Sequence, residues 1–285
     1  MLGRKQSISN NDWIKALADI KATVPKSHID KLAKETVAEI KAMTEGKKVA
    51  YGWSGGKDSI VLGVLCEKAK ITACMLGATK GLEYPAFMAW VENNKPAGLE
   101  IVQTKHDMAW LAANPDMLFP DAGKRDPKTR KRASLLQNRW FAIVQHWAQT
   151  KYFKDKGLDI LLVGRRRADG NYTGKGGNIY TNNNGVTRYS PLASWRHEDL
   201  LAYVAYYDLP MPPIYEWPNG FKCGTHPWPA RQHIGSYENG WQEISSIDPT
   251  LIEEAAKADI MSAIKFLEVG NDNQRKAGKS DTGGK

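Results

Sequence analysis

The sequence predicts an α/β fold: a doubly wound, mostly parallel sheet of five strands with helices on both faces, together with N-terminal helices and a C-terminal extension. Two observations predict it. From Lys48 onward, short apolar segments alternate with helical patterns, as in a parallel sheet whose crossover connections are helices. The first strand also runs into the first helix through a glycine-rich turn, and ligands of such sheets bind just past the carboxyl ends of the strands.

Residues 1–46 are expected to form a helical segment ahead of the sheet. Apolar residues recur there at helical spacing in two groups, Trp13, Ile14, Leu17 and Ile20, then Ile29, Leu32, Val37, Ile40 and Met43. This spacing predicts two amphipathic helices, whose apolar faces would either cover the sheet or form a homodimer surface.

Residues 47–215 are expected to form the α/β domain. Strands are predicted at 48–53, 71–77, 99–104 and 159–163, and helices at 58–69, 84–94, 106–113 and 134–153. The stretches Asn114–Arg132 and Ala168–Gly185, rich in proline or in glycine and asparagine, are expected to be mobile loops over the site. Residues 216–270 form the expected C-terminal extension, and the polar end 271–285 is expected to be a disordered tail.

Composition fits an enzyme with a sizeable core. The chain has 285 residues, of which 42% are hydrophobic, and no apolar run approaches the length of a membrane span. The first residues lack the apolar stretch of a secretory signal, so a cytoplasmic location without membrane association is expected. Three cysteines are too few for a disulfide framework, and Cys66 and Cys74 fall in predicted core elements.

The turn Ser54-Gly55-Gly56-Lys57-Asp58-Ser59 has the chemistry of a phosphate site. Glycines let a ligand approach backbone N–H groups, and the start of the next helix adds its positive end. Lys57 supplies a point charge, and the two serine hydroxyls can bind phosphate oxygens. Asp58 could hold Mg²⁺ or cap the helix. The spacing is not that of a Walker A loop.

This turn resembles the S-G-G-K-D-S pyrophosphatase loop of enzymes that cleave ATP between its α and β phosphates. Two further blocks resemble the phosphoadenylyl-sulfate (PAPS) reductase branch of that superfamily. Leu161–Asp169 resembles its G-x-R segment, through Gly164, Arg165 and Arg166. Tyr189–Leu200, followed by Leu209-Pro210 and Ile214-Tyr215, resembles its P-[IL]-x-x-W-x-x-x-D segment and tail. The blocks cover about residues 48 to 226 in the family's order.

The resemblance implies an adenine-nucleotide enzyme. It implies that ATP with Mg²⁺ is bound, that adenylate passes to an acceptor, and that pyrophosphate leaves from the loop. Lys57 and Arg166 would neutralise phosphate charge and Ser54 and Ser59 would orient the phosphates. The nucleotide would contact, in addition, Gly55, Gly56, Asp58, Gly164 and Arg165. The acceptor is not readable, although sulfur metabolism or a sulfur-containing modification is the expected context.

Cys223 leaves an alternative open. PAPS reductases use a thiolate from an E-C-G-L-H segment, and Lys222-Cys223-Gly224-Thr225-His226 is similar to it, with lysine in place of glutamate. A thiol-dependent reductase with Cys223 as nucleophile and thioredoxin as partner is therefore the alternative enzyme. A structural role or half of a zinc site also remains open for this residue. An iron–sulfur cluster is not expected, since it needs four cysteines.

The formal net charge of +9 is concentrated in part between Lys124 and Arg132. This segment could bind nucleic acid, clamp phosphates or be a solvated surface, and a nucleotide-regulated nucleic-acid-binding protein is the hypothesis from another class. No role is assigned to four histidines that occur singly, His28, His106, His146 and His197.

Overall fold

The computed structural model describes residues 7–124 and 126–280. Two compact units make up the chain. The first comprises the chain up to Ala78, Pro85–Thr104 and Phe141–Thr225, and the second comprises Thr79–Tyr84, Lys105–Trp140 and the chain from His226 on. The domains expected from sequence are continuous stretches of chain. Each of the two units, in contrast, is assembled from several separate stretches that contact one another.

The first unit contains a six-stranded sheet in the order β3-β2-β1-β4-β6-β5. Its strands are β1 Val49–Gly52, β2 Cys74–Ala78, β3 Leu99–Gln103, β4 Ile160–Leu162, β5 Ile179–Thr181 and β6 Thr187–Tyr189. All neighbouring pairs are parallel except β5 with β6. The predicted mostly parallel α/β sheet is confirmed, with one strand more than expected.

Neither β5 nor β6 has a range among the strands predicted from sequence, and β5 lies within Ala168–Gly185, the stretch expected to be a mobile loop. Ile179, Tyr180 and Thr181 are residue types that favour strands. They pair with β6 across a turn in which Asn182 Oδ1 accepts hydrogen bonds from the Asn184 and Val186 N–H groups, at 3.0 and 2.9 Å. A hairpin therefore forms where glycine and asparagine content suggested a loop.

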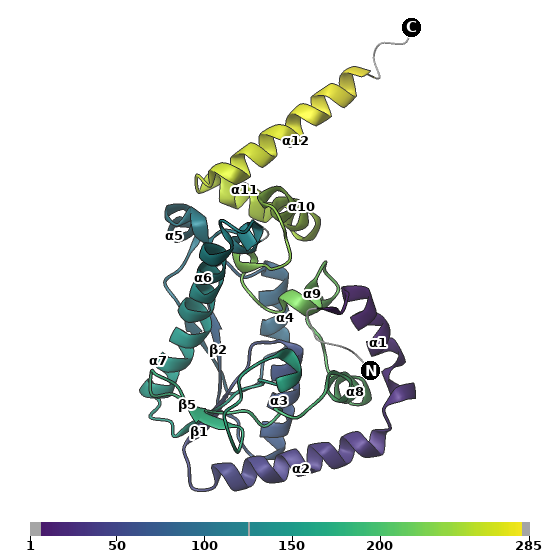
Figure 1. Ribbon diagram of the computed structural model, residues 1–285, viewed down its shortest axis with the longest axis vertical. Helices are drawn as coiled ribbons and strands as arrows, with labels where there is room; N and C mark the ends of the chain where they lie inside the picture. Colours follow the sequence, from purple (N-terminus) through teal and green to yellow (C-terminus); the bar gives the residue numbers. More distant parts are fainter. Residues whose placement is uncertain (1–6, 125, 281–285) are drawn as a thin grey trace. The chain divides into compact units, whose positions relative to one another are not determined.

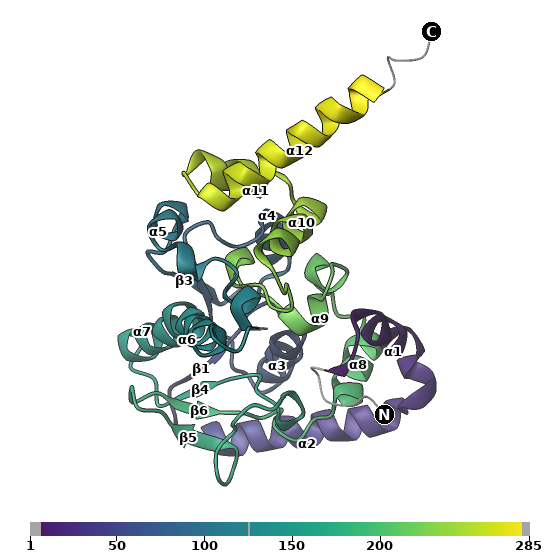
Figure 2. The same ribbon diagram turned by 45° about the horizontal axis from the view of Figure 1, so that its top comes forward.

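Helices cover both faces of the sheet (Figures 1 and 2). The elements on one side include α1 Asn10–Thr23, α2 Lys26–Thr44, α3 Lys57–Lys68 and α8 His197–Tyr206. Both N-terminal helices form as predicted, and they pack on neighbouring helices: α1 against α8, and α2 against α3 and α8. Their buried faces, which include Trp13, Ile20, Ile29 and Ile40, are thus used within the chain.

The opposite face packs against α7 Trp147–Asp155. Its buried cluster consists of Ala50, Met75, Val102, Leu158, Leu161, Val163 and Val186 from the sheet side, with Ala148 and Tyr152 of α7. Gly77 permits this close packing: a Cβ atom there would lie 2.8 Å from Ala148 Cβ and 2.9 Å from the Val144 carbonyl oxygen. The tight contact fixes α7 against β2.

The helix predicted at 134–153 forms, but a π-helical turn interrupts it. It comprises α6 Arg130–Phe141, the π-helical turn η4 Ala142–His146, and α7. Such turns add a residue to the helical repeat and are frequent at functional sites. His146 is the last residue of this turn.

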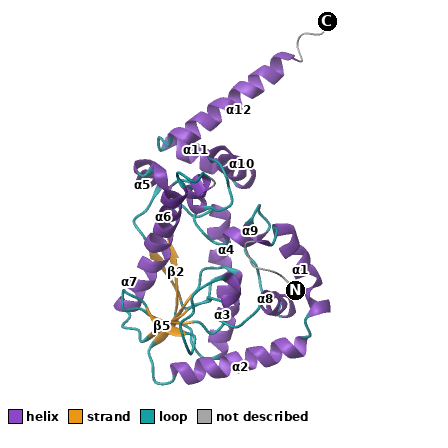
Figure 3. Ribbon diagram, viewed as in Figure 1, coloured by secondary structure: helices purple, strands orange, loops and turns teal. Residues whose placement is uncertain are grey.

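The second unit is helical, as the purple elements in Figure 3 show. It contains α5 Met108–Ala113, most of α6, α10 Tyr237–Ile247, α11 Thr250–Lys257 and α12 Met261–Ser280. An aromatic core holds it, in which the Phe119 ring lies 5.1 Å from Trp241 and 6.2 Å from Trp228. No helix in the described ranges is both long and apolar enough to cross a bilayer.

Two segments of the second unit were expected from sequence to be irregular: the loop at 114–132 and the tail from residue 271. Asn114–Arg132 contains the 3₁₀ turns η2 Pro115–Met117 and η3 Pro120–Lys124, and Phe119 between them is fully buried. The helix α12 is described as far as Ser280, and disorder of the tail from residue 271 stays a prediction. Residues 281–285 lie outside the described ranges.

Two short helices of the first unit lie beside the turn Ser54–Ser59. They are α4 Pro85–Asn94 and α9 Gly220–Cys223. The 3₁₀ turn η6 Pro213–Tyr215 contacts both of them. These elements bring the ends of the family-like segment together at the start of α3.

Candidate functional site

The turn from β1 to α3 has the backbone of an anion site. Gly55 has φ +69°, and a Cβ atom there would lie 3.0 Å from the Phe87 ring and 3.3 Å from the Trp90 ring. Helix α3 begins at Lys57 with Gly56 as its N-cap, which provides no side-chain cap hydrogen bond. The positive end of a mostly buried twelve-residue helix therefore lies at this turn, and its N-cap residue has no side chain to cap it.

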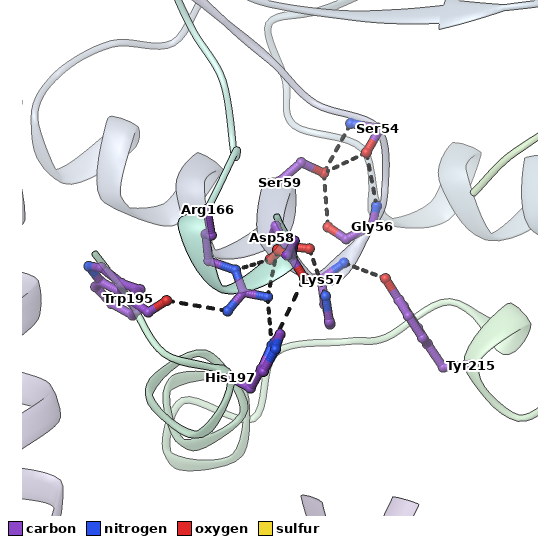
Figure 4. A network of polar contacts seen from close by, with 10 residues as sticks. Ser54, Gly56, Lys57, Asp58, Ser59, Arg166, Trp195, His197 and Tyr215 are labelled. Atoms are coloured by element: carbon purple, nitrogen blue, oxygen red, sulfur yellow. Dashed lines mark hydrogen bonds and ion pairs between the residues drawn. The ribbon is translucent and has the colours of Figure 1, made fainter. Parts of the chain in front are cut away.

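The two loop hydroxyls converge above this helix start (Figure 4). Ser54 Oγ lies 3.2 Å from Ser59 Oγ, and the Ser54 N–H donates to Ser59 Oγ at 3.0 Å. Ser59 Oγ in turn donates to the Gly56 carbonyl at 2.9 Å. The hydroxyls thus hold the turn closed and are placed together where a phosphate would replace their mutual contact.

Lys57 and Arg166 lie in a separate buried ion-pair cluster (Figure 4). Lys57 Nζ lies 2.7 Å from Asp58 Oδ2, and Arg166 Nε lies 2.6 Å from Asp58 Oδ1. Arg166 Nη2 lies 2.9 Å from Asp169 Oδ2. The Lys57 and Arg166 side chains are 2% and 0% exposed. Both cations expected to neutralise phosphates are thus paired with carboxylates in this arrangement, and their role toward a nucleotide stays a prediction.

Burial and charge have opposite effects on these groups. Burial alone would lower the pKa of Arg166, but the charges of Asp58 and Asp169 outweigh it and raise that pKa. The pKa of His197 is lowered by burial and by the Arg166 charge. His197 Nδ1 lies 3.3 Å from Arg166 Nη2 and, since a guanidinium only donates, accepts that hydrogen bond as a neutral ring.

Residues from distant segments, to which the sequence analysis gave no role, complete the cluster. The Trp13 ring lies 5.8 Å from Lys57 Nζ and packs edge-on against His197 at 4.8 Å. Tyr215 Oη accepts the Lys57 N–H at 2.7 Å. The N-terminal helix and the loop after α8 therefore fix the first turn of α3. Tyr215 could have been found from sequence, since it ends the family-like tail. Trp13 could not, because its spacing predicted only a packing role in a helix.

The G-x-R segment meets the loop directly. A Cβ atom on Gly164 would lie 3.1 to 3.3 Å from the backbone and Cβ of Asp58, so only glycine fits there without a shift. Arg166 turns toward Asp58. Arg165 turns elsewhere: its Nη1 donates to Tyr180 Oη at 2.7 Å, and its Nη2 lies 3.4 Å from His146 Nε2. The structure therefore brings Gly164 and Arg166 to the loop and places Arg165 beside it.

The Cys223 segment packs against the same loop. A Cβ atom on Gly56 would lie 3.7 Å from Thr225 Cγ2 and 3.4 Å from Tyr215 Oη. Asn10 holds this segment, since its Oδ1 accepts the Phe221 N–H at 2.9 Å. Cys223 itself is 1% exposed and forms no disulfide. A reagent would reach its sulfur only after the segment moved.

Asp58 does not fit the Mg²⁺ role expected for it. Both carboxylate oxygens accept from buried cations, Lys57 and Arg166, and a metal ion beside them would meet like charge. Within the described ranges, no group of three histidine, cysteine, aspartate or glutamate residues is arranged to hold a metal ion. The residues around this turn therefore do not fit a protein-bound metal.

The basic segment Lys124–Arg132 belongs to the second unit. Lys124 Nζ lies 3.5 Å from Asp121 Oδ1, Arg132 pairs with Asp116, and Arg130 Nε donates to the Lys124 carbonyl at 3.1 Å. Arg125 lies outside the described residues. Nucleic-acid binding by this segment stays a prediction.

Comparison with known proteins places this geometry in context. Residues 48–223 match the family model described as phosphoadenosine phosphosulfate reductase domain. A solved phosphoadenylyl-sulfate (PAPS) reductase from Candida auris, in a phosphate complex, is similar with a TM-score of 0.46 and 17% identity, over 68% of this chain and 92% of that one. No curated protein sequence matches the chain.

Proposed function

Because the chain belongs to the phosphoadenosine phosphosulfate reductase domain family, we propose that it is an ATP pyrophosphatase that transfers adenylate to an acceptor and releases pyrophosphate. The observation that carries the proposal is the complete Ser54–Ser59 loop, with converging hydroxyls at the start of α3, whose N-cap is a glycine. This arrangement suits the two terminal phosphates of ATP, since a helix start and backbone N–H groups favour anions.

The chain's own groups would act mainly by positioning. Ser54 and Ser59 would exchange their mutual hydrogen bond for phosphate oxygens, which places the pyrophosphate as leaving group at the positive end of α3. Asp58, held between Lys57 and Arg166, keeps the first helical turn rigid. Preorganised donors of this kind contribute several kcal/mol to phosphoryl chemistry because they need no reorganisation during the reaction. Mg²⁺ would enter with the triphosphate as part of the substrate.

The test is pyrophosphate release from ATP–Mg²⁺ by the purified full chain. We expect Ser54→Ala and Ser59→Ala to reduce kcat about tenfold or more, the effect of losing one donor to a charged group. Ser246→Ala is the matched control, because its hydroxyl bonds only the Glu243 carbonyl on α10. Equal activity in all three variants would contradict the proposed role of the loop.

One observation favours a second candidate, a thiol-dependent PAPS reductase. Thr225, two residues after Cys223, packs against Gly56 of the loop, so a sulfonucleotide in the loop would lie near this segment. The test is sulfite release from PAPS with reduced thioredoxin. Activity lost in Cys223→Ser and kept in Cys66→Ala, whose cysteine is buried in α3, would favour the reductase over the pyrophosphatase.

A further inference from the structure

Arg188 differs from the other buried arginines of the described chain. Arg166 and Arg231, which are equally buried, each form an ion pair with a carboxylate, Asp58 and Glu243 respectively. Arg188 is 2% exposed, its Nε donates to the amide oxygen of Gln149 at 3.0 Å, and its Nη2 has no hydrogen-bond partner. A buried guanidinium nitrogen without an acceptor is costly unless a ligand supplies one.

A second arginine lies beside it, also without a carboxylate among the described residues. Arg165 Nη1 donates to Tyr180 Oη and its Nη2 donates to His146 Nε2. Tyr180 pairs directly with Arg188 across β5 and β6, so their side chains share one face of the hairpin. Two guanidinium groups therefore meet around a single tyrosine hydroxyl.

The acceptors around this arginine pair, defined as Arg165 and Arg188, are all neutral. Burial and the charges of Arg188 and Arg165 lower the pKa of His146 to about 4, so the ring is uncharged near neutral pH. Burial and the neighbouring Arg165 also lower the pKa of Arg188, against the opposing effect of Tyr180. Two adjacent positive charges are thus held by histidine, tyrosine and glutamine without any negative charge.

The arginine pair lies on the α7 side of the sheet, where Arg188 contacts Gln149 of α7. Arg165 directly follows Gly164, which packs closely against the backbone of Asp58. Gln149 of α7 approaches Gly52, the last residue of β1, where a Cβ atom would lie 3.8 Å from Gln149 Nε2. The π-helical turn that ends at His146 brings that ring to Arg165. The pair is therefore built by α7, β4 and the β5–β6 hairpin together.

We propose that Arg165 and Arg188, with the Tyr180 hydroxyl, form a second anion site that takes a tetrahedral oxyanion, a sulfate or phosphate group. Guanidinium groups match such oxyanions through paired N–H donors. The anion would accept from Arg188 Nη2 and supply the negative charge that the pair lacks. The oxyanion is either a free acceptor or a second phosphate on the nucleotide, and assigning it to the reaction rests on the proposed function.

The experiment titrates sodium sulfate, by calorimetry, into the full chain already saturated with α,β-methylene-ATP, which fills the loop without cleavage. We expect Arg188→Gln to weaken sulfate binding about tenfold or more, which corresponds to the loss of one charged hydrogen bond. Arg167→Gln is the matched control: it removes the same charge from an exposed neighbour whose Nη2 donates to Asn178 Oδ1. Binding in that control should stay within about twofold of wild type.

A second titration distinguishes the two sources of the oxyanion. If the site takes a second phosphate of the nucleotide, adenosine 3′,5′-bisphosphate binds wild type more tightly than AMP, and Arg188→Gln abolishes the difference. If it takes a free acceptor, sulfate binds with nucleotide present and the two nucleotides bind alike. Either pattern supports the site.

The inference is overturned if neither ligand shows any dependence on Arg188. Arg165→Gln, which changes a half-buried residue, replaces Arg188→Gln if the latter does not fold. The proposed function fails separately: a chain that releases no pyrophosphate from ATP would still bind sulfate through the arginine pair.

Discussion

Asp58 forms ion pairs with two buried cations, Lys57 and Arg166, at the first turn of α3. Its oxygens accept from Lys57 and Arg166, and the helix start that would receive phosphates depends on this arrangement. Asp58, for which the sequence left Mg²⁺ binding and helix capping both open, therefore has a structural task in this cluster. Its removal would leave two cations in an interior that cannot solvate them.

Asp58→Asn should lower the free energy of unfolding by about 3 kcal/mol, since breaking a buried pair costs more than the pair contributes. Asp169 still compensates Arg166, which keeps the loss below the largest values seen for such changes. Urea unfolding measures it. Asp155→Asn, which breaks the exposed pair with Lys151, should cost less than about 1 kcal/mol. Equal losses in the two variants would contradict a buried role for Asp58.

His146 gives stability a dependence on pH. Burial and the Arg188 and Arg165 charges lower its folded pKa to about 4, while the unfolded ring titrates near 6.5. Between these values the unfolded chain binds more protons, so stability falls as the pH falls through that window. The loss is on the order of 1 kcal/mol once solvent screening of this half-buried ring is included.

The measurement compares chemical unfolding of wild type and His146→Gln from pH 7 to pH 4. The variant stays neutral at this position, so the difference between the two curves isolates His146 from His197, whose pKa is also lowered. The wild type should lose more stability on acidification. Parallel curves would show that His146 is not held neutral.

At the scale of single elements, the close contact at Gly77 holds α7 against β2. Gly77→Ala should destabilise the protein by about 1–3 kcal/mol, because a methyl group would meet Ala148 Cβ at 2.8 Å and the Val144 carbonyl at 2.9 Å. Gly176→Ala has nothing within 4 Å of the new methyl and should change stability by less than about 0.5 kcal/mol. Thermal unfolding of both variants checks this, and a neutral Gly77→Ala would mean that α7 can move away from the sheet.

Alternating apolar segments were enough to predict most elements of the sheet and the loop at the end of β1. The strands β5 and β6 could not be located in this way, because three residues each carry too little pattern. The π-helical turn at 142–146 also could not be predicted from the spacing of apolar residues, since a single added residue leaves that spacing nearly helical.

The candidate site was predictable where it is continuous in sequence and not where it is assembled from distant segments. Ser54, Asp58, Ser59, Gly164 and Arg166 were all found from the motifs. Trp13 and His197 contact Lys57 or its partners only because α1 and α8 fold back onto α3. Arg188 carries no motif signal of its own, and its importance depends on the absence of a carboxylate around it.

At the scale of the whole molecule, the segment that matches the family does not include all of the folded structure. It covers residues 48–223, but the second unit takes Thr79–Tyr84 and Lys105–Trp140 from within that range and the rest from His226 on. Trp228 and Trp241 from the later segment pack on Phe119 from the earlier one. The second unit therefore cannot form its core from the matched segment alone.

A chain that ends after Thr225 should consequently expose the Phe119 cluster and bind the dye ANS, with near-UV circular dichroism reduced. A chain that ends after Gly270 keeps every aromatic residue of that core and should behave as the full chain. Dye fluorescence and circular dichroism of both truncated chains provide the test. If the shorter chain proved as compact as the longer one, the second unit would not need its C-terminal helices.

The register of β1 sets the order in which the sheet can be completed. Val49 pairs with Ile160 of β4, about 110 residues later, whereas the partner on its other side, β2, follows within about 25 residues. At roughly 5–20 residues per second of synthesis, one edge of β1 stays open for roughly 6–20 seconds after it emerges from the ribosome. Open edges recruit other chains, and a short strand limits that hazard. The four-residue length of β1 thus serves the newborn protein as well as the finished one.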